Sequence, residues 1–257
     1  MRVRRILLPA LPLAAGIALF GATGQPADGR MTLPHDVAQA VRIAPEPAPA
    51  EAATRQQRPL RFTLIDTAGA VVRRWPGGPV MGTIAATTPL GANSWSWAFV
   101  TTKDGRWAKV GLTWTPNGRT GWVRTAGRQE VRTPTWVQAD LSRRQVMLMR
   151  GRHPLVVFKA AIGTPATPTP TGRFFVTDLV ATGDPYGPFG WYAFGLSGHQ
   201  PNLPAGWSGG NQLAIHGTNE PSSIGTAASA GCLRVSAAAL GTLKRYLRLG
   251  TPVVIHP

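Results

Sequence analysis

The chain has 257 residues, enough for one large domain or for two small domains with cores of their own. Its 30 glycines and 24 prolines favour a loop-rich β protein over a helical bundle, and its single cysteine excludes a disulfide within the chain. Of the formal net charge of +16, residues 1–24 carry +3, residues 60–132 carry +7 and residues 133–257 carry +6, and this positive charge indicates an anionic partner, either a nucleic acid or an anionic cell-wall polymer.

Residues 1–24 have the pattern of a secretory signal peptide. Arg2, Arg4 and Arg5 give a positive start, residues 6–20 form an apolar run, and small residues follow. Because this run is shorter than the ~20 apolar residues of a membrane span, we expect cleavage, with an uncleaved membrane anchor as the alternative. Secretion to the cell wall or periplasm argues against a nucleic acid as the natural ligand. A contact with a membrane is expected only through this segment, and only if it stays uncleaved.

Residues 25–59 form a predicted linker. They are rich in Ala, Pro, Glu and Gln, a composition typical of an extended, disordered tether. We expect them to act as a spacer between the membrane or wall and the folded part of the chain.

Residues 60–132 are predicted to form a small β domain. Alternating apolar and aromatic residues indicate four short strands, at residues 60–65, 94–100, 107–110 and 120–123. Short strands at close spacing favour a small β-barrel. The pattern Trp107…Gly121-Trp122-Val123 resembles bacterial SH3-like domains, and we expect the tryptophans of this domain to lie in its core.

Residues 133–257 are predicted to form a second, mostly β domain with one helix. Apolar runs bounded by turn residues indicate five strands, at residues 136–140, 145–150, 155–161, 174–178 and 251–255. A stripe of leucines predicts a helix over residues 237–249, with Ser236 as its N-cap and Gly250 as its end.

Two stretches of this second domain, residues 214–219 and 229–235, carry groups suited to chemistry. A thiol becomes a nucleophile when it loses its proton, and His216 in the first stretch can accept the proton of Cys232 in the second. Gly231 lets the backbone turn sharply and leaves N–H groups free to face a developing oxyanion. The pattern favours acyl transfer, and a buried inert cysteine with a structural histidine is the alternative.

The two stretches resemble the signature of the YkuD-type L,D-transpeptidase family, with His216-Gly217-Thr218-Asn219 followed by Ser229-Ala230-Gly231-Cys232-Leu233-Arg234. Three more segments are similar to segments of that family: Thr169-Pro-Thr-Gly-Arg-Phe174, Gly187-Pro-Phe-Gly190 and the ending Gly250-Thr-Pro-Val-Val-Ile255. The resemblance covers about residues 134–256. It implies a β-sandwich-like catalytic domain with one helix.

By this resemblance Cys232 is the nucleophile and His216 is the general base, oriented by a backbone carbonyl near Gly217. The N–H groups of Gly231 and Cys232 would form the oxyanion hole, with Gly217 permitting a close approach beside the histidine. The resemblance implies no metal and no cofactor, and the sequence has no His, Cys and Asp cluster with metal-ligand spacing.

Four further positions match the part of the motif that shapes the substrate pocket: Thr218, Asn219, Ser229 and Arg234. Arg234 would pair with a carboxylate of the substrate, and a structural salt bridge is the alternative. The family usually has His, sometimes Arg, where this chain has Ala230. Since the family's base matches His216, we expect activity to survive, with Ala230 altering the polarity of the pocket.

The resemblance implies a monomeric peptidoglycan L,D-transpeptidase. Its thiol would attack the carbonyl between a diamino acid and the terminal D-Ala of a tetrapeptide stem, an amine of a neighbouring stem would take the acyl group, and carbapenems would acylate the same thiol. Two alternatives stay open: an L,D-carboxypeptidase or D-amino-acid exchange enzyme, and a catalytically degenerate wall-binding protein. The expected partners are peptidoglycan stem peptides and anionic cell-wall polymers.

Overall fold

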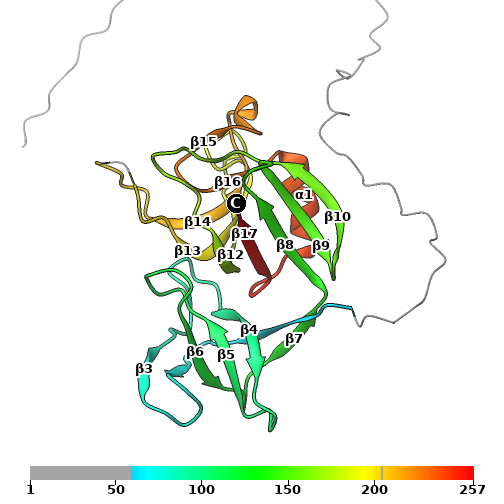
Figure 1. Cartoon of the computed structure of the whole chain (residues 1–257). Helices are drawn as coiled ribbons and strands as arrows, with labels where there is room; N and C mark the ends of the chain where they lie inside the picture. Colours follow the sequence, from blue (N-terminus) through cyan, green and yellow to red (C-terminus); the bar gives the residue numbers. More distant parts are fainter. Residues whose placement is uncertain (1–58, 204) are drawn as a thin grey trace, which may run out of the picture. The chain divides into compact units, whose positions relative to one another are not determined.

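The structure, a computed structural model, describes residues 59–203 and 205–257 (Figure 1). This part of the chain is mainly β with one α-helix, as the sequence predicts. The expected signal peptide at residues 1–24 and all of the expected linker except Pro59 lie outside the described residues. Within residues 59–203 and 205–257, no helix is long and apolar enough to cross a membrane.

The first part of the described chain forms an antiparallel sheet of seven strands. The strands are β1 (Phe62–Asp66), β2 (Val71–Arg73), β3 (Val80–Thr83), β4 (Trp95–Thr101), β5 (Trp107–Gly111), β6 (Thr120–Arg124) and β7 (Glu130–Thr133). Their order is β3-β2-β6-β5-β4-β1-β7, so β3 and β7 lie at the edges. Buried Ile65, Val72, Val110 and Val123 contribute to its core. The resemblance to SH3-like domains stays a prediction.

The four strands predicted in this sheet are present, each within two residues of the expected bounds. Trp97 and Trp107 are buried as expected, whereas Trp75 is 52% exposed. The sequence pattern did not predict β2, β3 and β7. β2 is short and carries a bulge between Val72 and Arg73, and β7 is a charged edge strand, so both lack the alternation that marks a half-buried strand.

The second part of the described chain forms an eight-stranded mixed sheet and a two-stranded sheet. The eight strands are β8 (Thr135–Asp140), β9 (Gln145–Arg150), β10 (His153–Lys159), β12 (Gly172–Ala181), β13 (Tyr192–His199), β14 (Gln212–His216), β16 (Leu233–Arg234) and β17 (Pro252–His256), and the two are β11 (Ile162–Gly163) and β15 (Ala227–Ser229). The order of the larger sheet is β10-β9-β8-β17-β12-β13-β14-β16. Its two parallel pairs, β8 with β17 and β14 with β16, join segments that are distant in sequence.

The five strands predicted in this part are present, with bounds shifted by up to three residues. β13 was not predicted because two glycines interrupt its apolar pattern. A Cβ on Gly198 would lie 2.5 Å from the ring of Phe174, and a Cβ on Gly195 would lie 3.0 Å from Asp178. Glycine is needed at these two positions because side chains of the neighbouring β12 occupy the space that a Cβ would fill. The alternation of apolar and polar residues in the sequence does not reveal such a requirement.

The α-helix α1 (Ala237–Tyr246) begins as predicted, with Ser236 Oγ accepting the N–H of Ala239 at 3.2 Å. It ends three residues before the expected end. A turn replaces the last helical turn, in which the N–H of Thr251 donates to the carbonyl of Arg248 at 3.0 Å. Buried Leu240 and Leu243 face the core of the larger sheet, and each buried leucine contributes about 1.5–3 kcal/mol.

Candidate active site

The parallel pair of β14 and β16 brings residues 214–219, which contain His216, next to residues 229–235, which contain Cys232 (Figure 1). The register aligns Ile215 with Leu233 and His216 with Arg234. Cys232 immediately precedes β16, and His216 is the last residue of β14. The two residues therefore lie two positions apart along neighbouring strands, whose spacing is about 4.8 Å.

His216 is a buried histidine, 4% exposed, whose ring is fixed on two sides. Its Nδ1 lies 2.6 Å from the carbonyl oxygen of Gly217, and because a carbonyl only accepts, Nδ1 carries the proton and Nε2 keeps a lone pair. The ring of Phe189 packs edge-on against the imidazole, with 4.9 Å between ring centres. Burial lowers the pKa of His216 from 6.5 to about 4, opposed by the bond to Gly217 and assisted by the charge of Arg234. The imidazole is therefore a neutral base at neutral pH.

Phe189 is held in place by a close backbone contact beside His216. Gly190 adopts a φ of 61°, which glycine tolerates without strain. A Cβ on the facing Gly217 would lie 2.9 Å from the Cα of Gly190 and 3.0 Å from the carbonyl oxygen of Phe189. The close approach expected at Gly217 is thus made to the loop at residues 187–190. The contact between Phe189 and the imidazole was not predicted, although Phe189 belongs to a segment that the family resemblance singles out.

The turn from Ser229 to Cys232 is stabilised from within by the hydroxyl of Ser229. Its Oγ accepts the N–H of Gly231 at 3.0 Å and donates to the carbonyl of Cys232 at 2.6 Å. Gly231 has a φ of 115°, a conformation that favours glycine. The side chain of Ser229 is buried and both of its hydrogen bonds lie within the turn, and the substrate contact expected of it stays a prediction. Ser229 positions the turn.

The same bonds alter the expected oxyanion hole. The N–H of Gly231 is bound to Ser229, and the N–H of Gly217 donates to the carbonyl of Tyr192 at 3.4 Å. Within residues 59–203 and 205–257, the N–H of Cys232 has no hydrogen-bond acceptor. Of the three backbone groups considered, the N–H of Cys232 is therefore the one available to a developing oxyanion.

Cys232 is half-buried, with its Sγ 3.9 Å from the carbonyl oxygen of Gln212. Burial raises the pKa of the thiol above its ordinary value, while a backbone hydrogen bond at Ala214 and the charge of Arg234 act in the opposite direction. Both Cys232 and His216 are consequently uncharged at neutral pH. Such a pair suits a proton transfer that accompanies nucleophilic attack better than a preformed thiolate.

The other predicted pocket residues lie around this pair. Arg234 forms a salt bridge with Glu220, with 3.2 Å between Nη1 and Oε2, which supports the structural alternative for this arginine. The Nε of Arg234 is buried and has no hydrogen-bond partner among the described residues. Thr218 is half-buried, and its Oγ1 accepts the N–H of Glu220 at 3.0 Å, whereas Asn219 is exposed. In the described part of the chain, no cluster of three or more His, Cys, Asp or Glu side chains could hold a metal ion.

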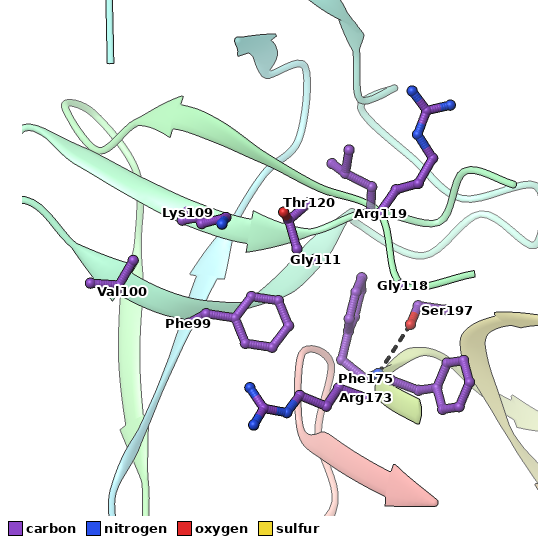
Figure 2. A pocket seen from close by; sticks show the side chains of 12 residues that line it. Phe99, Val100, Lys109, Gly111, Gly118, Arg119, Thr120, Arg173, Phe175 and Ser197 are labelled. Carbon is purple, nitrogen blue, oxygen red and sulfur yellow. Dashed lines mark hydrogen bonds between the residues drawn. The ribbon is translucent and has the colours of Figure 1, made fainter. Parts of the chain in front are cut away.

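A cavity of about 430 Å³ lies away from the candidate catalytic pair, between the seven-stranded sheet and β12 (Figure 2). The rings of Phe99 and Phe175 form its apolar part. Lys109, Arg119 and Arg173 also line it, and no carboxylate does. The cavity is therefore both apolar and cationic.

Comparison with known proteins identifies the family of the chain. The L,D-transpeptidase catalytic domain named YkuD matches residues 134–255, the part that contains β14, β16 and the turn before Cys232. The protein YkuD of Bacillus licheniformis is 32% identical over 124 residues, which are 48% of this chain and 67% of that protein. The chain belongs to the YkuD family. The family resemblance found in the sequence is thereby confirmed.

Another member of the YkuD family, from Bacillus subtilis (strain 168), is 30% identical over 123 residues, 48% of this chain and 66% of that protein. The chain thus spans about two thirds of the length of these two relatives. Among solved structures, an L,D-transpeptidase from Mycobacterium smegmatis matches with a TM-score of 0.39 and 17% identity, over 76% of this chain and 82% of that one. L,D-transpeptidase 3 from Mycobacterium tuberculosis, in complex with a faropenem-derived adduct, matches with a TM-score of 0.41 and 16% identity, over 75% and 93%.

Proposed function

We propose that this YkuD-family protein is a peptidoglycan L,D-transpeptidase that works through a thioester on Cys232, with His216 as the general base. The observation that carries the proposal is the parallel register of β14 and β16, which pairs His216 with Arg234, two residues after Cys232. Membership of the family supports acyl transfer and peptidoglycan stem peptides as the substrate. Export to the cell wall or periplasm belongs to the proposal and rests on the pattern of residues 1–24.

The first half of the reaction forms the thioester. The Sγ of Cys232 attacks the carbonyl between the diamino acid and the terminal D-Ala while its proton passes to Nε2 of His216. The N–H of Cys232 faces the developing oxyanion. As the tetrahedral intermediate collapses, the C–N bond breaks, the proton passes from His216 to the leaving amine, and D-Ala departs.

The second half transfers the acyl group to a neighbouring stem. An amine of that stem attacks the thioester carbonyl, and His216 accepts the amine proton. The C–S bond then breaks, the sulfur takes up the proton, and the new amide is the cross-link. Because His216 returns to its neutral form, the pair is ready for the next stem peptide.

The substitution Cys232→Ala tests this proposal. It should abolish both the cross-linking of a tetrapeptide muropeptide and the formation of a covalent carbapenem adduct, because both need the sulfur. Mass spectrometry of the products and of the intact protein reads the two outcomes. A carbapenem adduct on the Cys232→Ala protein would sink the assignment.

The acyl acceptor separates the main proposal from its nearest alternative. If water or a free D-amino acid attacks the thioester, the protein is an L,D-carboxypeptidase or an exchange enzyme with the same catalytic pair. Incubation of one tetrapeptide muropeptide with a free D-amino acid other than D-Ala distinguishes them, since cross-linking gives a dimer, hydrolysis gives a tripeptide and exchange gives a tetrapeptide of altered mass.

The degenerate alternative rests on Ala230, which stands where the family usually has His. The side chain of Ala230 is half-buried and cannot take part in proton transfer, but its carbonyl is bound by Gln200 at 3.3 Å. The turn that carries Cys232 is therefore held through its backbone at this position. We favour the active enzyme, and a Cys232 that forms no thioester with a tetrapeptide would favour the degenerate one.

We also infer that the protein binds an anionic cell-wall polymer through the cationic cavity (Figure 2). Lys109, Arg119 and Arg173 line the cavity, and none of them forms a salt bridge with another described residue. Cations without a salt-bridge partner beside the rings of Phe99 and Phe175 suit a polymer that joins anionic groups by carbon-rich units.

A further inference from the structure

Gln200 is a buried glutamine that follows β13 and lies behind the nucleophile turn, with 3% of its surface exposed. The two hydrogens of its amide nitrogen are shared among three backbone carbonyls, those of Thr167 at 3.2 Å, Pro168 at 2.9 Å and Ala230 at 3.3 Å. Its amide oxygen accepts the N–H of Asn202 at 2.9 Å. Carbonyls on one side and an N–H on the other fix the orientation of the amide.

Gln200 also packs directly on the residue before the nucleophile. A Cβ on Gly231 would lie 2.1 Å from the Nε2 of Gln200 and 3.1 Å from its Cδ. The turn therefore cannot move toward Gln200 without a clash, and the hydrogen bond to Ala230 resists movement away from it. The position of the Gly231 backbone is limited in both directions.

The same amide joins the turn to a second loop. The carbonyl of Ser229 accepts from the N–H of Thr164 at 3.0 Å and from the Oγ1 of Thr167 at 3.1 Å. Gln200 binds the carbonyls of Thr167 and Pro168 in that loop. It thus connects the end of β13, the loop at residues 164–168 and the turn that carries Cys232.

We propose that Gln200 is a positioning residue that holds the Cys232 turn in the geometry from which the thiol and the N–H of Cys232 act on the substrate carbonyl. The proposal rests on the function proposed above for Cys232. All hydrogen bonds of the Gln200 amide go to backbone groups, so Gln200 acts through the turn and makes no contact with the substrate.

The substitution Gln200→Met tests this role because Met keeps the approximate volume and removes every hydrogen bond of the amide. The kcat for cross-linking should fall about tenfold or more, with KM changed by less than about twofold, because a misplaced nucleophile affects the reaction more than the binding. Gln138→Met is the matched control. Gln138 is a half-buried glutamine on β8 whose Nε2 lies 2.8 Å from the Nε2 of His256, and this variant should keep the wild-type kcat.

The substitution Gln200→Glu gives a second readout that uses no substrate. An ionised Glu would face the three carbonyl oxygens with no donor, whereas a protonated Glu has the shape of Gln and can donate. The test compares the rate at which iodoacetamide alkylates Cys232 in the variant with the rate in the wild type. The ratio of the two rates should rise about tenfold when the pH is lowered from about 8 to about 5, because the introduced carboxylate then takes up a proton. Since the chain has one cysteine, the intact mass reports on Cys232 alone.

A wild-type kcat in Gln200→Met, or an alkylation ratio that stays constant with pH, would overturn the positioning role. If the Gln200→Met protein shows no cooperative thermal unfolding and is therefore not folded, the pH dependence of alkylation in the Gln200→Glu protein tests the positioning role instead. The proposed function fails separately: a wild-type protein that forms no thioester with a tetrapeptide refutes the transpeptidase, while the alkylation ratio still tests Gln200.

Discussion

Burial shifts the pKa values of His216 and Cys232 in opposite directions. It disfavours the charged form of each group, which is the protonated imidazole in one case and the deprotonated thiol in the other. It lowers the pKa of the imidazole to about 4 and raises the pKa of the thiol. The positive charge of Arg234 lowers both, so it opposes the effect on the thiol and adds to the effect on the imidazole. At neutral pH the proton therefore stays on the sulfur, and in the proposed mechanism it leaves only when the substrate carbonyl is attacked.

The neutral state of His216 predicts a loss of stability in mild acid. In the unfolded chain this histidine binds a proton below its ordinary pKa of 6.5, whereas in the folded protein it does so only near pH 4. The contribution of His216 to stability is thus complete above about pH 6.5 and falls as the pH approaches about 4, a loss of up to about 3 kcal/mol. Urea denaturation at about pH 7 and about pH 4.5 measures this change.

The control for that measurement is His216→Asn, which removes the titrating group. The free energy of unfolding of this variant should change less than that of the wild type between the same two pH values. Its absolute stability is not the readout, because the contact with Phe189 also changes. Equal pH dependence in the two proteins would show that His216 is not the group responsible.

At the scale of elements, the loop at residues 187–190 contacts the end of β14 through backbone atoms. The substitution Gly217→Ala should therefore disturb this contact. The added Cβ would lie 2.9 Å from the Cα of Gly190, and backbone atoms cannot swing aside as a side chain can. We expect a loss of about 1–3 kcal/mol in stability and a lower kcat as Phe189 leaves the imidazole. Thermal unfolding and the muropeptide assay measure the two effects.

The matched control is Gly241→Ala in α1, where a Cβ would meet no atom within 4 Å. This change should leave kcat unaltered and raise stability by about 0.5–1 kcal/mol, because alanine favours a helix. If Gly217→Ala behaves like Gly241→Ala, the loop does not depend on the close backbone contact.

Elements with a strong local signal were predictable from the sequence, and elements defined by distant partners were not. The start of α1 follows from the Ser236 side chain, which caps the helix in the structure as expected. The predicted end of α1 was wrong because the hydrogen bond between Thr251 and Arg248, which closes the turn after the helix, depends on the strand that follows. β16 has two residues and exists because it pairs with β14, so no local pattern marks it.

The candidate site shows the same division. Cys232 and His216 were singled out by residue type and by motif, because chemistry limits which side chains can act as nucleophile and base; the structure brings their strands side by side, and their catalytic roles stay a prediction. The hydrogen bonds of Ser229 within the turn and the amide of Gln200 behind it were missed, since a buried glutamine at an ordinary strand end has no signature in one sequence.

At the scale of the whole molecule, the net charge of +16 predicts salt-dependent binding of an anionic wall polymer. Affinity for poly(glycerol phosphate), measured by fluorescence titration, should fall as salt is raised, because screening weakens contacts between exposed charges. The double substitution Lys109→Glu and Arg173→Glu should weaken binding about tenfold or more by reversing two charges at the cavity. Arg74→Glu, an exposed control in the seven-stranded sheet region, should have a much smaller effect.

Equal losses from the cavity variant and the Arg74→Glu control would mean that the polymer follows overall charge and does not select the cavity. Such a result would leave the transpeptidase proposal intact, because the cavity lining does not include Cys232 or His216.

The protonated resting state of Cys232 also bears on the lifetime of the protein. Oxidants such as peroxides react with thiolates far faster than with thiols, and a sulfur oxidised beyond the sulfenic acid is lost as a nucleophile. A half-buried thiol whose pKa is raised by burial offers oxidants little thiolate. If Cys232 is the proposed nucleophile, a lone cysteine without a partner for repair is thereby protected between turnovers.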